Sequence, residues 1–199
     1  MESDPAHDIT HIKRVVNTTS YLTELEDAVD WITLPAACLH DCVAVSKDSD
    51  RRSQASRLAA DAAVAFLRQA DFPTRYLDGI YHAIEAHSFS ANIAPRSVEA
   101  RVVQDADRLE ALGAIGIARC LMTGGSFGTA LYSEDDPFCE HRSPDERAFA
   151  IDHFYQKLLG LPETMQTQAG RAEAERRVAY MHGFLAQLRA EIDGLVRGA

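Results

Sequence analysis

Apolar positions recur at helical spacing along most of the chain. Within residues 8–26, an apolar stripe repeats every three to four residues, through Ile12, Val15, Val16 and Leu22. This spacing is the period of one face of an α-helix. Residues 53–70, 74–87 and 168–196 share it, and residues 28–43 are apolar over most of their length. No segment alternates apolar and polar residues over the length of a strand. The pattern predicts an all-α fold of about seven or eight helices.

For two helices, the sequence predicts which residues face inward or where the helix begins and ends. The inward stripe of residues 53–70 is expected to comprise Ala55, Leu58, Ala59, Ala62, Phe66 and Leu67. Ser97 is expected to cap one long helix over residues 98–122, because serine oxygens accept the free N–H groups of a helix start. The core candidates of this helix are Val102, Val103, Ala106, Leu109 and Leu112. Gly113 and Gly116 would allow another helix to cross closely, and Gly124 with Gly125 would end the helix.

The C-terminal part begins with an expected loop over residues 126–142. Residues 143–146, Ser-Pro-Asp-Glu, match a capping box with proline at the first helical position, so a helix is predicted to start there. The sequence LGLPETM interrupts this helix before the final one. We expect a single domain over residues 1–199, with a core over about residues 7–125 and C-terminal helices over about residues 143–199.

Composition narrows the classes of partner. The 199 residues carry a formal net charge of −10, which argues against binding to a nucleic-acid polymer but not against a small anionic substrate. No apolar run reaches about 18 residues, so no membrane span is expected. The acidic, polar N-terminus does not look like a signal peptide, and a cytoplasmic protein is predicted. The four cysteines form no CxxC pair. Cys38 and Cys42 are interpreted as small core residues, and disulfides are not expected.

The segment AACLHDC, residues 36–42, places His40 and Asp41 side by side within an apolar run. Burying a charged group is costly unless the group is paired or coordinated, so this pair is expected to bind something. Further carboxylates occur in QDADRLEA, residues 104–111. Asp105 and Asp107 diverge by about 200° around a helix, so they cannot both face one ion. Asp107 shares its face with small and apolar residues, whereas Asp105 lies beside Arg101 and Arg108, where an ion pair would explain it.

Several segments together resemble the HD-domain metal-dependent phosphohydrolase superfamily. They are HDITHIKRV, LHD, EAHSFS, VVQDADRLEALGAIGIAR and DHFYQKLLGLPETMQT, and the similarity spans about residues 7–167. The last two segments are similar to the bacterial YedJ/YpgQ-type branch. The resemblance implies an all-helical fold and a set of four metal ligands, His11, His40, Asp41 and Asp107. It also implies a nucleotide pyrophosphohydrolase that favours divalent manganese and cleaves (deoxy)nucleoside triphosphates.

The implied donor set suits a catalytic divalent metal. Two imidazoles and two carboxylates fit Mn²⁺, with Mg²⁺, Ni²⁺, Fe²⁺ and Zn²⁺ as alternatives, and the absence of thiolate disfavours a structural zinc site. Several superfamily members carry an acidic residue three or four positions after HD, where this chain has Ala44 and Val45. His87 is therefore the predicted proton donor, ahead of Glu85, and Asp41 is expected to act in catalysis as well. The candidate partners of phosphate oxygens are Arg14, Lys47, Arg51, Arg108 and Lys157.

Two other functions remain open at this point. A phosphomonoesterase acting on mononucleotides would release orthophosphate from a monophosphate, rather than pyrophosphate from a triphosphate. A non-catalytic helical module could keep the fold for binding a ligand or a partner. The sequence also leaves the oligomeric state open, with a homodimer formed through a helical face as one alternative.

Overall fold

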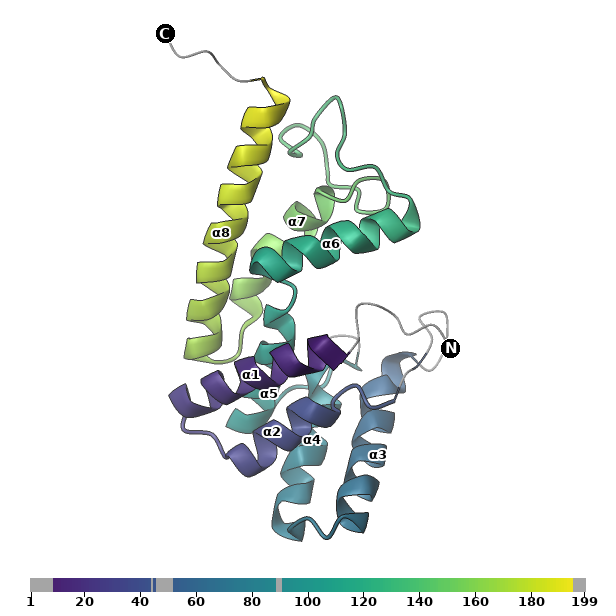
Figure 1. Ribbon diagram of the computed structural model, residues 1–199, viewed down its shortest axis with the longest axis vertical. Coiled ribbons are helices and arrows are strands. Elements are labelled where there is room, and N and C mark those ends of the chain that lie inside the picture. The colour runs from purple at the N-terminus through teal and green to yellow at the C-terminus, as the bar shows by residue number, and fades with distance from the viewer. Residues whose placement is uncertain (1–8, 44, 46–51, 89–90, 195–199) are drawn as a thin grey trace. The chain divides into compact units, whose positions relative to one another are not determined.

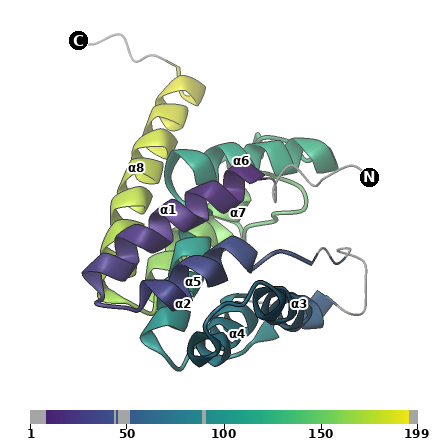
Figure 2. The same cartoon turned by 60° about the horizontal axis from the view of Figure 1, so that its bottom comes forward.

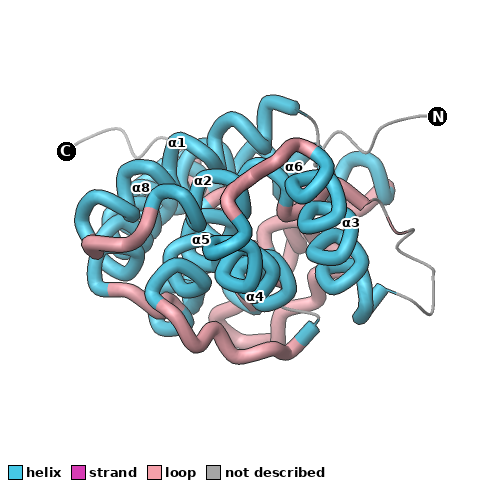
Figure 3. Tube along the Cα trace, turned by 90° about the horizontal axis from the view of Figure 1, so that it is seen from below, coloured by secondary structure: helices cyan, strands magenta, loops and turns pink. Residues whose placement is uncertain are grey.

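The computed structural model describes residues 9–43, 45, 52–88 and 91–194. Over these residues the chain forms eight α-helices and no strand, with one isolated bridge between Ala130 and Phe149. Figure 3 shows helices joined by loops throughout. The prediction of an all-α fold is confirmed. None of the described helices is both long and apolar enough to cross a membrane.

The chain divides into two compact units. The first comprises residues 1–110 and 166–170, and the second comprises residues 111–165 and 171–199. The helices of the first unit are α1 (Ile9–Leu25), α2 (Asp30–Leu39), α3 (Ala55–Gln69), α4 (Leu77–His87) and α5 (Val98–Leu109), with short 3₁₀ segments η2 (Arg52–Gln54) and η3 (Thr74–Tyr76). The second unit contains α6 (Gly113–Phe127), α7 (Asp152–Gln156), the 3₁₀ segment η5 (Leu158–Thr164) and most of α8 (Gln168–Ile192).

The core of the first unit lies between α3, α4 and α5. Helices α3 and α4 run side by side as a hairpin, and α4 packs in turn against α5 (Figure 2). Small residues of α3, including Ala59, Ala60 and Ala63, are buried in one cluster with Ile80 and Ile84 of α4. Alanines on the contact face let two helices approach closely, and the isoleucines fill the space between them.

The inward face of α3 differs from the predicted stripe. Ala59 and Leu67 are buried as expected, but Phe66 is 58% exposed and Ala62 also faces solvent. Ala60, Ala63 and Val64 are buried instead. The prediction is therefore confirmed for Ala59 and Leu67 and wrong for Ala62 and Phe66, because the buried face is rotated toward Ala60, Ala63 and Val64. The segment is apolar on more than one face, so its sequence period does not distinguish the packed face from the exposed one.

The predicted helix over residues 98–122 is interrupted. Helix α5 ends at Leu109, and α6 begins at Gly113, which has a φ of 70°. A Cβ at Gly116 would lie 2.2 Å from the carbonyl oxygen of Ala111. The two glycines thus permit a sharp turn of the chain itself. The expected close approach of another helix occurs at Gly113, where a Cβ would lie 3.3 Å from the side chain of Arg177 on α8, whereas the nearest atoms at Gly116 belong to Ala111. Helix α6 also continues past Gly124 and Gly125 and ends at Gly128, whose φ of 72° forms a left-handed cap.

No helix starts at residues 143–146, contrary to the capping-box prediction. The Asp145 side chain accepts hydrogen bonds from the N–H groups of Arg147 and Ala148, but these residues form a turn. Asp152 is fully buried and pairs with the Arg142 guanidinium, and it also accepts the N–H of Asp145. These bonds tie the turn to the start of α7, so a local capping signal serves a loop rather than a helix.

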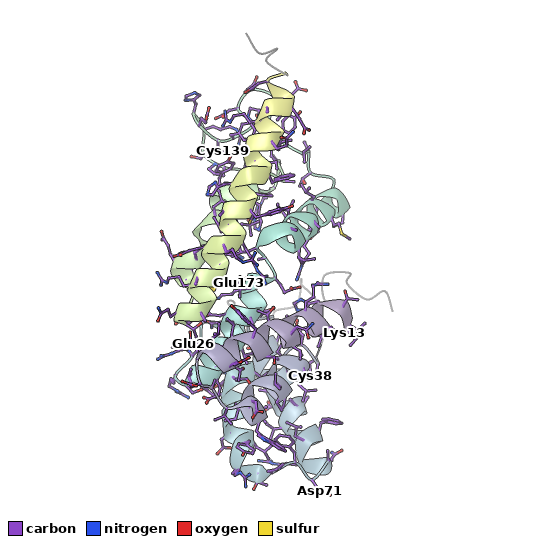
Figure 4. The ribbon with its side chains drawn as sticks, turned by 60° about the vertical axis from the view of Figure 1, so that its left-hand side comes forward. Lys13, Glu26, Cys38, Asp71, Cys139 and Glu173 are labelled. Atoms are coloured by element: carbon purple, nitrogen blue, oxygen red, sulfur yellow. The ribbon has the colours of Figure 1, made fainter. Side chains whose placement is uncertain are left out.

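The cysteines of the first unit are also placed differently from the prediction. Cys38 and Cys42 are both exposed, so the interpretation of these two residues as core is wrong (Cys38 is labelled in Figure 4). All four cysteines are free thiols in this structure.

Candidate metal centre

The first unit brings the four predicted ligands together. His11 lies on α1, His40 and Asp41 lie at the C-terminal end of α2, and Asp107 lies near the end of α5. The Oδ1 atom of Asp107 is 3.6 Å from His11 Nε2 and 3.7 Å from His40 Nε2. The Oδ2 atom of Asp41 is 3.5 Å from His40 Nε2. Residues separated by up to 96 positions in sequence therefore meet at one point.

His87, at the last position of α4, joins the same cluster. Its Nε2 atom lies 3.5 Å from Asp41 Oδ1, and its ring lies 4.9 Å from that of His40, centroid to centroid. The two oxygens of Asp41 thus face different histidines, His40 and His87. The ligand atoms of two overlapping groups, His11–His40–Asp107 and His40–Asp41–His87, each lie within 4.8 Å of one another.

The three histidines are oriented by their other ring nitrogen. His40 Nδ1 lies 2.7 Å from the carbonyl oxygen of Ala37, and His87 Nδ1 lies 2.6 Å from that of Ile84. His11 Nδ1 lies 3.3 Å from Glu110 Oε2. A nitrogen that donates to an oxygen carries the proton, which leaves Nε2 with a lone pair. In the neutral rings of His11 and His40, Nε2 then presents a lone pair toward Asp107, whereas His87 Nε2 faces Asp41 Oδ1 and can carry a second proton.

The residues fit a divalent metal ion. His40 Nε2 is buried and makes no hydrogen bond to a described protein group. A buried polar atom without such a partner is costly unless another species satisfies it. Asp41 and Asp107 keep 29% of their side chains exposed, so the cluster is open to solvent on the carboxylate side. Neutral imidazoles with carboxylates are the ligands that borderline divalent metals prefer.

Burial and charge act differently on the two neighbouring imidazoles of the metal-free protein. Burial lowers the pKa of His40, outweighing the opposing charges of Asp107 and Asp41. Burial also disfavours the charged form of His87, but the hydrogen bond that His87 donates to Asp41 and the charges of Asp107 and Asp41 raise the pKa of His87 above its ordinary value. Adjacent groups whose environments separate their pKa values are typical of acid and base assignments in active sites.

The neighbouring carboxylate, Asp105, does not face the cluster and instead binds backbone N–H groups. It is fully buried, and its oxygens accept the backbone N–H groups of Gln166 and Thr167 and the Thr167 hydroxyl at 2.8–3.1 Å. This carboxylate therefore fixes residues 166–170, together with Glu26, which accepts the N–H of Ala169 (Glu26 is labelled in Figure 4). The sequence had indicated an ion pair with Arg101 or Arg108. Burial raises the pKa of Asp105 against the hydrogen bonds from Gln166 and Thr167 and the charge of Arg108, so Arg108 does interact with this carboxylate. The backbone partners of Asp105 lie 61 and 62 residues away and could not be read from the helix pattern.

The five basic residues that were predicted to bind phosphate oxygens differ in their position and in their present partners. Arg14 pairs with Glu110, with Nε and Nη2 each 2.8 Å from Oε2. Arg108 is partly buried beside Asp107 on α5. Lys157 is exposed between α7 and η5 in the second unit. Lys47 and Arg51 lie outside the described residues. Phosphate binding by these five residues remains a prediction.

Two buried polar residues, Gln104 of α5 and Glu110 directly after its end, lie beside the cluster and were not singled out from the sequence. Glu110 contacts His11, and Gln104 donates from Nε2 to the carbonyl oxygen of Ala86, next to His87, at 2.6 Å. Both are only 3% exposed. Gln104, Asp107 and Glu110 are spaced three residues apart, so they follow one side of the helix. This three-residue spacing is the sequence feature from which Gln104 and Glu110 could have been predicted to lie beside Asp107.

Comparison with known proteins places the chain in a family. A family model described as HD domain matches residues 8–112. YpgQ of Bacillus subtilis (strain 168) is 34% identical over 198 residues, which cover 98% of this chain and 88% of YpgQ. The crystal structure of B. subtilis YpgQ in complex with ADP aligns with a TM-score of 0.73 and 35% identity, over 95% of this chain and 88% of that one. A crystal structure of an HD-superfamily hydrolase from Bacillus thuringiensis aligns with a TM-score of 0.73 and 34% identity, over 94% of this chain and 87% of that one. The chain therefore belongs to the HD-domain superfamily of hydrolases, in the branch that includes YpgQ.

Proposed function

We propose that the protein is a metal-dependent phosphohydrolase that acts on a nucleotide, cleaving a (deoxy)nucleoside triphosphate at its α-phosphorus. The observation that carries this proposal is the convergence of His11, His40, Asp41 and Asp107 on one point beside His87. The reaction consumes one water and yields a nucleoside monophosphate and pyrophosphate. The crystal structure of B. subtilis YpgQ in complex with ADP supports a nucleotide as the ligand class.

His11, His40, Asp41 and Asp107 would hold the metal, with Mn²⁺ as the expected ion and Mg²⁺, Ni²⁺, Fe²⁺ and Zn²⁺ as alternatives. A bound divalent ion would supply Lewis acidity toward a phosphate oxygen and lower the pKa of a bound water. The protein provides the orientation of each ligand. The backbone carbonyl of Ala37 and the carboxylate of Glu110 hold the imidazoles of His40 and His11 with Nε2 directed at the carboxylates.

His87 is the proposed proton donor. Its Nδ1 is held by the carbonyl oxygen of Ile84, and its Nε2 faces Asp41 Oδ1. Burial opposes the charged form of His87, but Asp41 and Asp107 raise its pKa above the ordinary value, the direction that a proton donor needs. In this role His87 Nε2–H would donate its proton to the departing phosphate oxygen. Asp41 would act twice, as a metal ligand through one oxygen and as the orienting partner of His87 through the other.

The basic residues would bind phosphate oxygens around this centre. Arg108 is the nearest candidate on α5, one residue after Asp107. Arg14 can bind phosphate only in competition with Glu110, because its guanidinium already pairs with that carboxylate. Lys47, Arg51 and Lys157 stay candidates from the sequence.

We further expect a cytoplasmic protein that binds small phosphorylated molecules and no nucleic-acid polymer, with a homodimer as one alternative for the oligomeric state.

A product-resolved nucleotide screen tests the proposal. The purified protein is incubated with Mn²⁺, and in parallel with the other four metals, against nucleoside mono-, di- and triphosphates. We expect pyrophosphate and a nucleoside monophosphate from one or more triphosphates, and no turnover after chelation of the metal. Orthophosphate from monophosphates would identify the phosphomonoesterase instead. Metal binding without turnover of any phosphate ester or anhydride would favour the non-catalytic module and refute the proposal.

A further inference from the structure

Glu110 connects the last turn of α5 to two residues of α1 through a single oxygen. Its Oε2 atom lies 3.3 Å from His11 Nδ1 and 2.8 Å from both Nε and Nη2 of Arg14. The side chain of Glu110 is 4% exposed, and that of His11 is 1% exposed. A carboxylate in so enclosed a position is costly unless its oxygens are satisfied, and here a guanidinium and an imidazole satisfy it.

The imidazole of His11 is held differently from those of His40 and His87. The latter two place Nδ1 on a backbone carbonyl three residues earlier in their own helical turn. His11 instead places Nδ1 against the side chain of a residue 99 positions away. Its ring orientation therefore depends on a side chain that substitution can remove, whereas a backbone carbonyl stays in place when side chains change.

Arg14 keeps the carboxylate in position. It lies one turn after His11 on α1, and its Nη1 contacts the Thr10 hydroxyl at 3.2 Å while its other two nitrogens contact Glu110. A planar guanidinium bound through several atoms leaves the carboxylate little freedom to rotate. Arg14 thus contributes to the orientation of His11 indirectly, through Glu110.

We infer that Glu110, braced by Arg14, is the positioning residue of the metal centre that sets the Nδ1–H tautomer and ring orientation of His11. The inference rests on the proposed metal site and extends it to a residue that does not itself contact the ion. Carboxylates that accept the far N–H of a metal-bound histidine raise its basicity and fix its orientation, and their removal typically weakens metal affinity about 10–100-fold.

Metal binding alone tests this role, without substrate. The dissociation constant for Mn²⁺ is measured by calorimetry for the wild type and for Glu110→Ala, Glu110→Gln, Arg14→Ala and Glu99→Ala. Glu99 is the matched control, because it is also a carboxylate of α5 that links to another part of the first unit, accepting the N–H of Val29 at 3.4 Å. We expect about 10–100-fold weaker binding for Glu110→Ala and a smaller loss for Arg14→Ala. We expect the smallest loss for Glu110→Gln, which keeps an acceptor oxygen, and no change for Glu99→Ala.

The tautomer of His11 in the metal-free wild type gives a second, independent readout. The ¹⁵N chemical shifts of its ring should show a protonated Nδ1 and an unprotonated Nε2, and this preference should be lost in Glu110→Ala. A wild-type His11 with the proton on Nε2 would overturn the inference even where a variant fails to fold. So would wild-type Mn²⁺ affinity in folded Glu110→Ala. A protein that binds Mn²⁺ but hydrolyses no nucleotide would refute the proposed function and leave this inference standing.

Discussion

Asp105 and Asp107 have the same side chain two positions apart on one helix, yet their surroundings are opposite. Asp107 points with 29% of its side chain exposed toward His11 and His40, whereas Asp105 is fully buried and accepts three hydrogen bonding groups of Gln166 and Thr167. A helix turns residues two apart to nearly opposite sides. One carboxylate is therefore available for an ion, and the other is committed to the fold.

Replacing each of these carboxylates should have a different consequence. Asp107→Ala should lose bound metal and nearly all activity while keeping most of its stability, because the side chain lies in the open part of the site. Asp105→Ala should keep the metal but unfold more easily, since each buried donor left unpaired costs about 1–3 kcal/mol. Metal analysis and urea unfolding of both variants decide between these roles. Full metal occupancy in Asp107→Ala, with loss in Asp105→Ala, would reverse the assignment.

The role of His87 as proton donor can be tested by its replacement. If it donates a proton, His87→Gln should lower kcat by about 10²–10⁴-fold. The Mn²⁺ dissociation constant should stay close to that of the wild type, because the four proposed ligands remain. The ring nevertheless lies within reach of the cluster, with Nε2 3.5 Å from Asp41 Oδ1. A large loss of Mn²⁺ affinity in this variant would identify His87 as a further ligand and contradict its role as donor.

Among the helices, the interruption between α5 and α6 has the clearest physical cause. Gly113 starts α6 with a φ of 70°, a conformation that residues with a Cβ rarely adopt. A Cβ there would also lie 3.3 Å from the side chain of Arg177 on α8. The turn separates α5, which carries Asp107, from α6, which belongs to the second unit.

Substitution of this glycine tests the requirement. Gly113→Ala should destabilise the protein by about 1–2 kcal/mol, the cost of a left-handed conformation for an alanine. Gly125 is a matched control in the same helix, because a Cβ there would meet no atom within 4 Å. Gly125→Ala should be neutral or stabilising by up to about 1 kcal/mol, since alanine is the better helix former. Equal effects of the two changes in thermal unfolding would show that the positive φ imposes no cost.

For the molecule as a whole, the buried pair of Asp152 and Arg142 should make stability depend on pH. Burial disfavours the charged carboxylate, but the Arg142 guanidinium and the N–H of Asp145 outweigh it and lower the pKa of Asp152. A depressed pKa in the folded state stabilises the protein above the unfolded value, about 3.9, and this contribution is lost as the pH falls through the folded value.

Asp152→Asn should remove this dependence. Because Arg142 keeps 25% of its side chain exposed, the cost at neutral pH should lie at the lower end for a broken buried pair, about 3 kcal/mol. The difference from the wild type should shrink as the pH falls below about 4, because the Asp152 carboxyl of the unfolded wild type then takes up a proton, whereas the asparagine amide of the variant does not titrate. Urea unfolding in chelator across this range provides the measurement. If the difference in unfolding free energy stays constant with pH, the stability that the pair contributes does not depend on the charge of Asp152.

The sequence by itself determined the local features. The helical period located α1, α4 and α8, and the buried positions Val102, Val103, Ala106, Leu109 and Leu112 were predicted correctly. Helix geometry alone separated Asp105 from Asp107, and the resemblance to the HD superfamily was confirmed. These features depend on residues within a few turns of one another, or on ordered motifs, which a linear pattern can express.

The tertiary structure decided everything that depends on partners distant in sequence. Helix α3 could bury either of two faces, and its packing against α4 selected the alanine face over Phe66. Asp105 obtained its partners from residues 166 and 167, and Glu110 obtained His11 and Arg14 from α1. The Ser-Pro-Asp-Glu signal became a turn because Asp152 and Arg142 fixed the segment. A carboxylate has the same sequence signal whether it faces an ion, a backbone amide or an arginine, and only the fold determines which of these it meets.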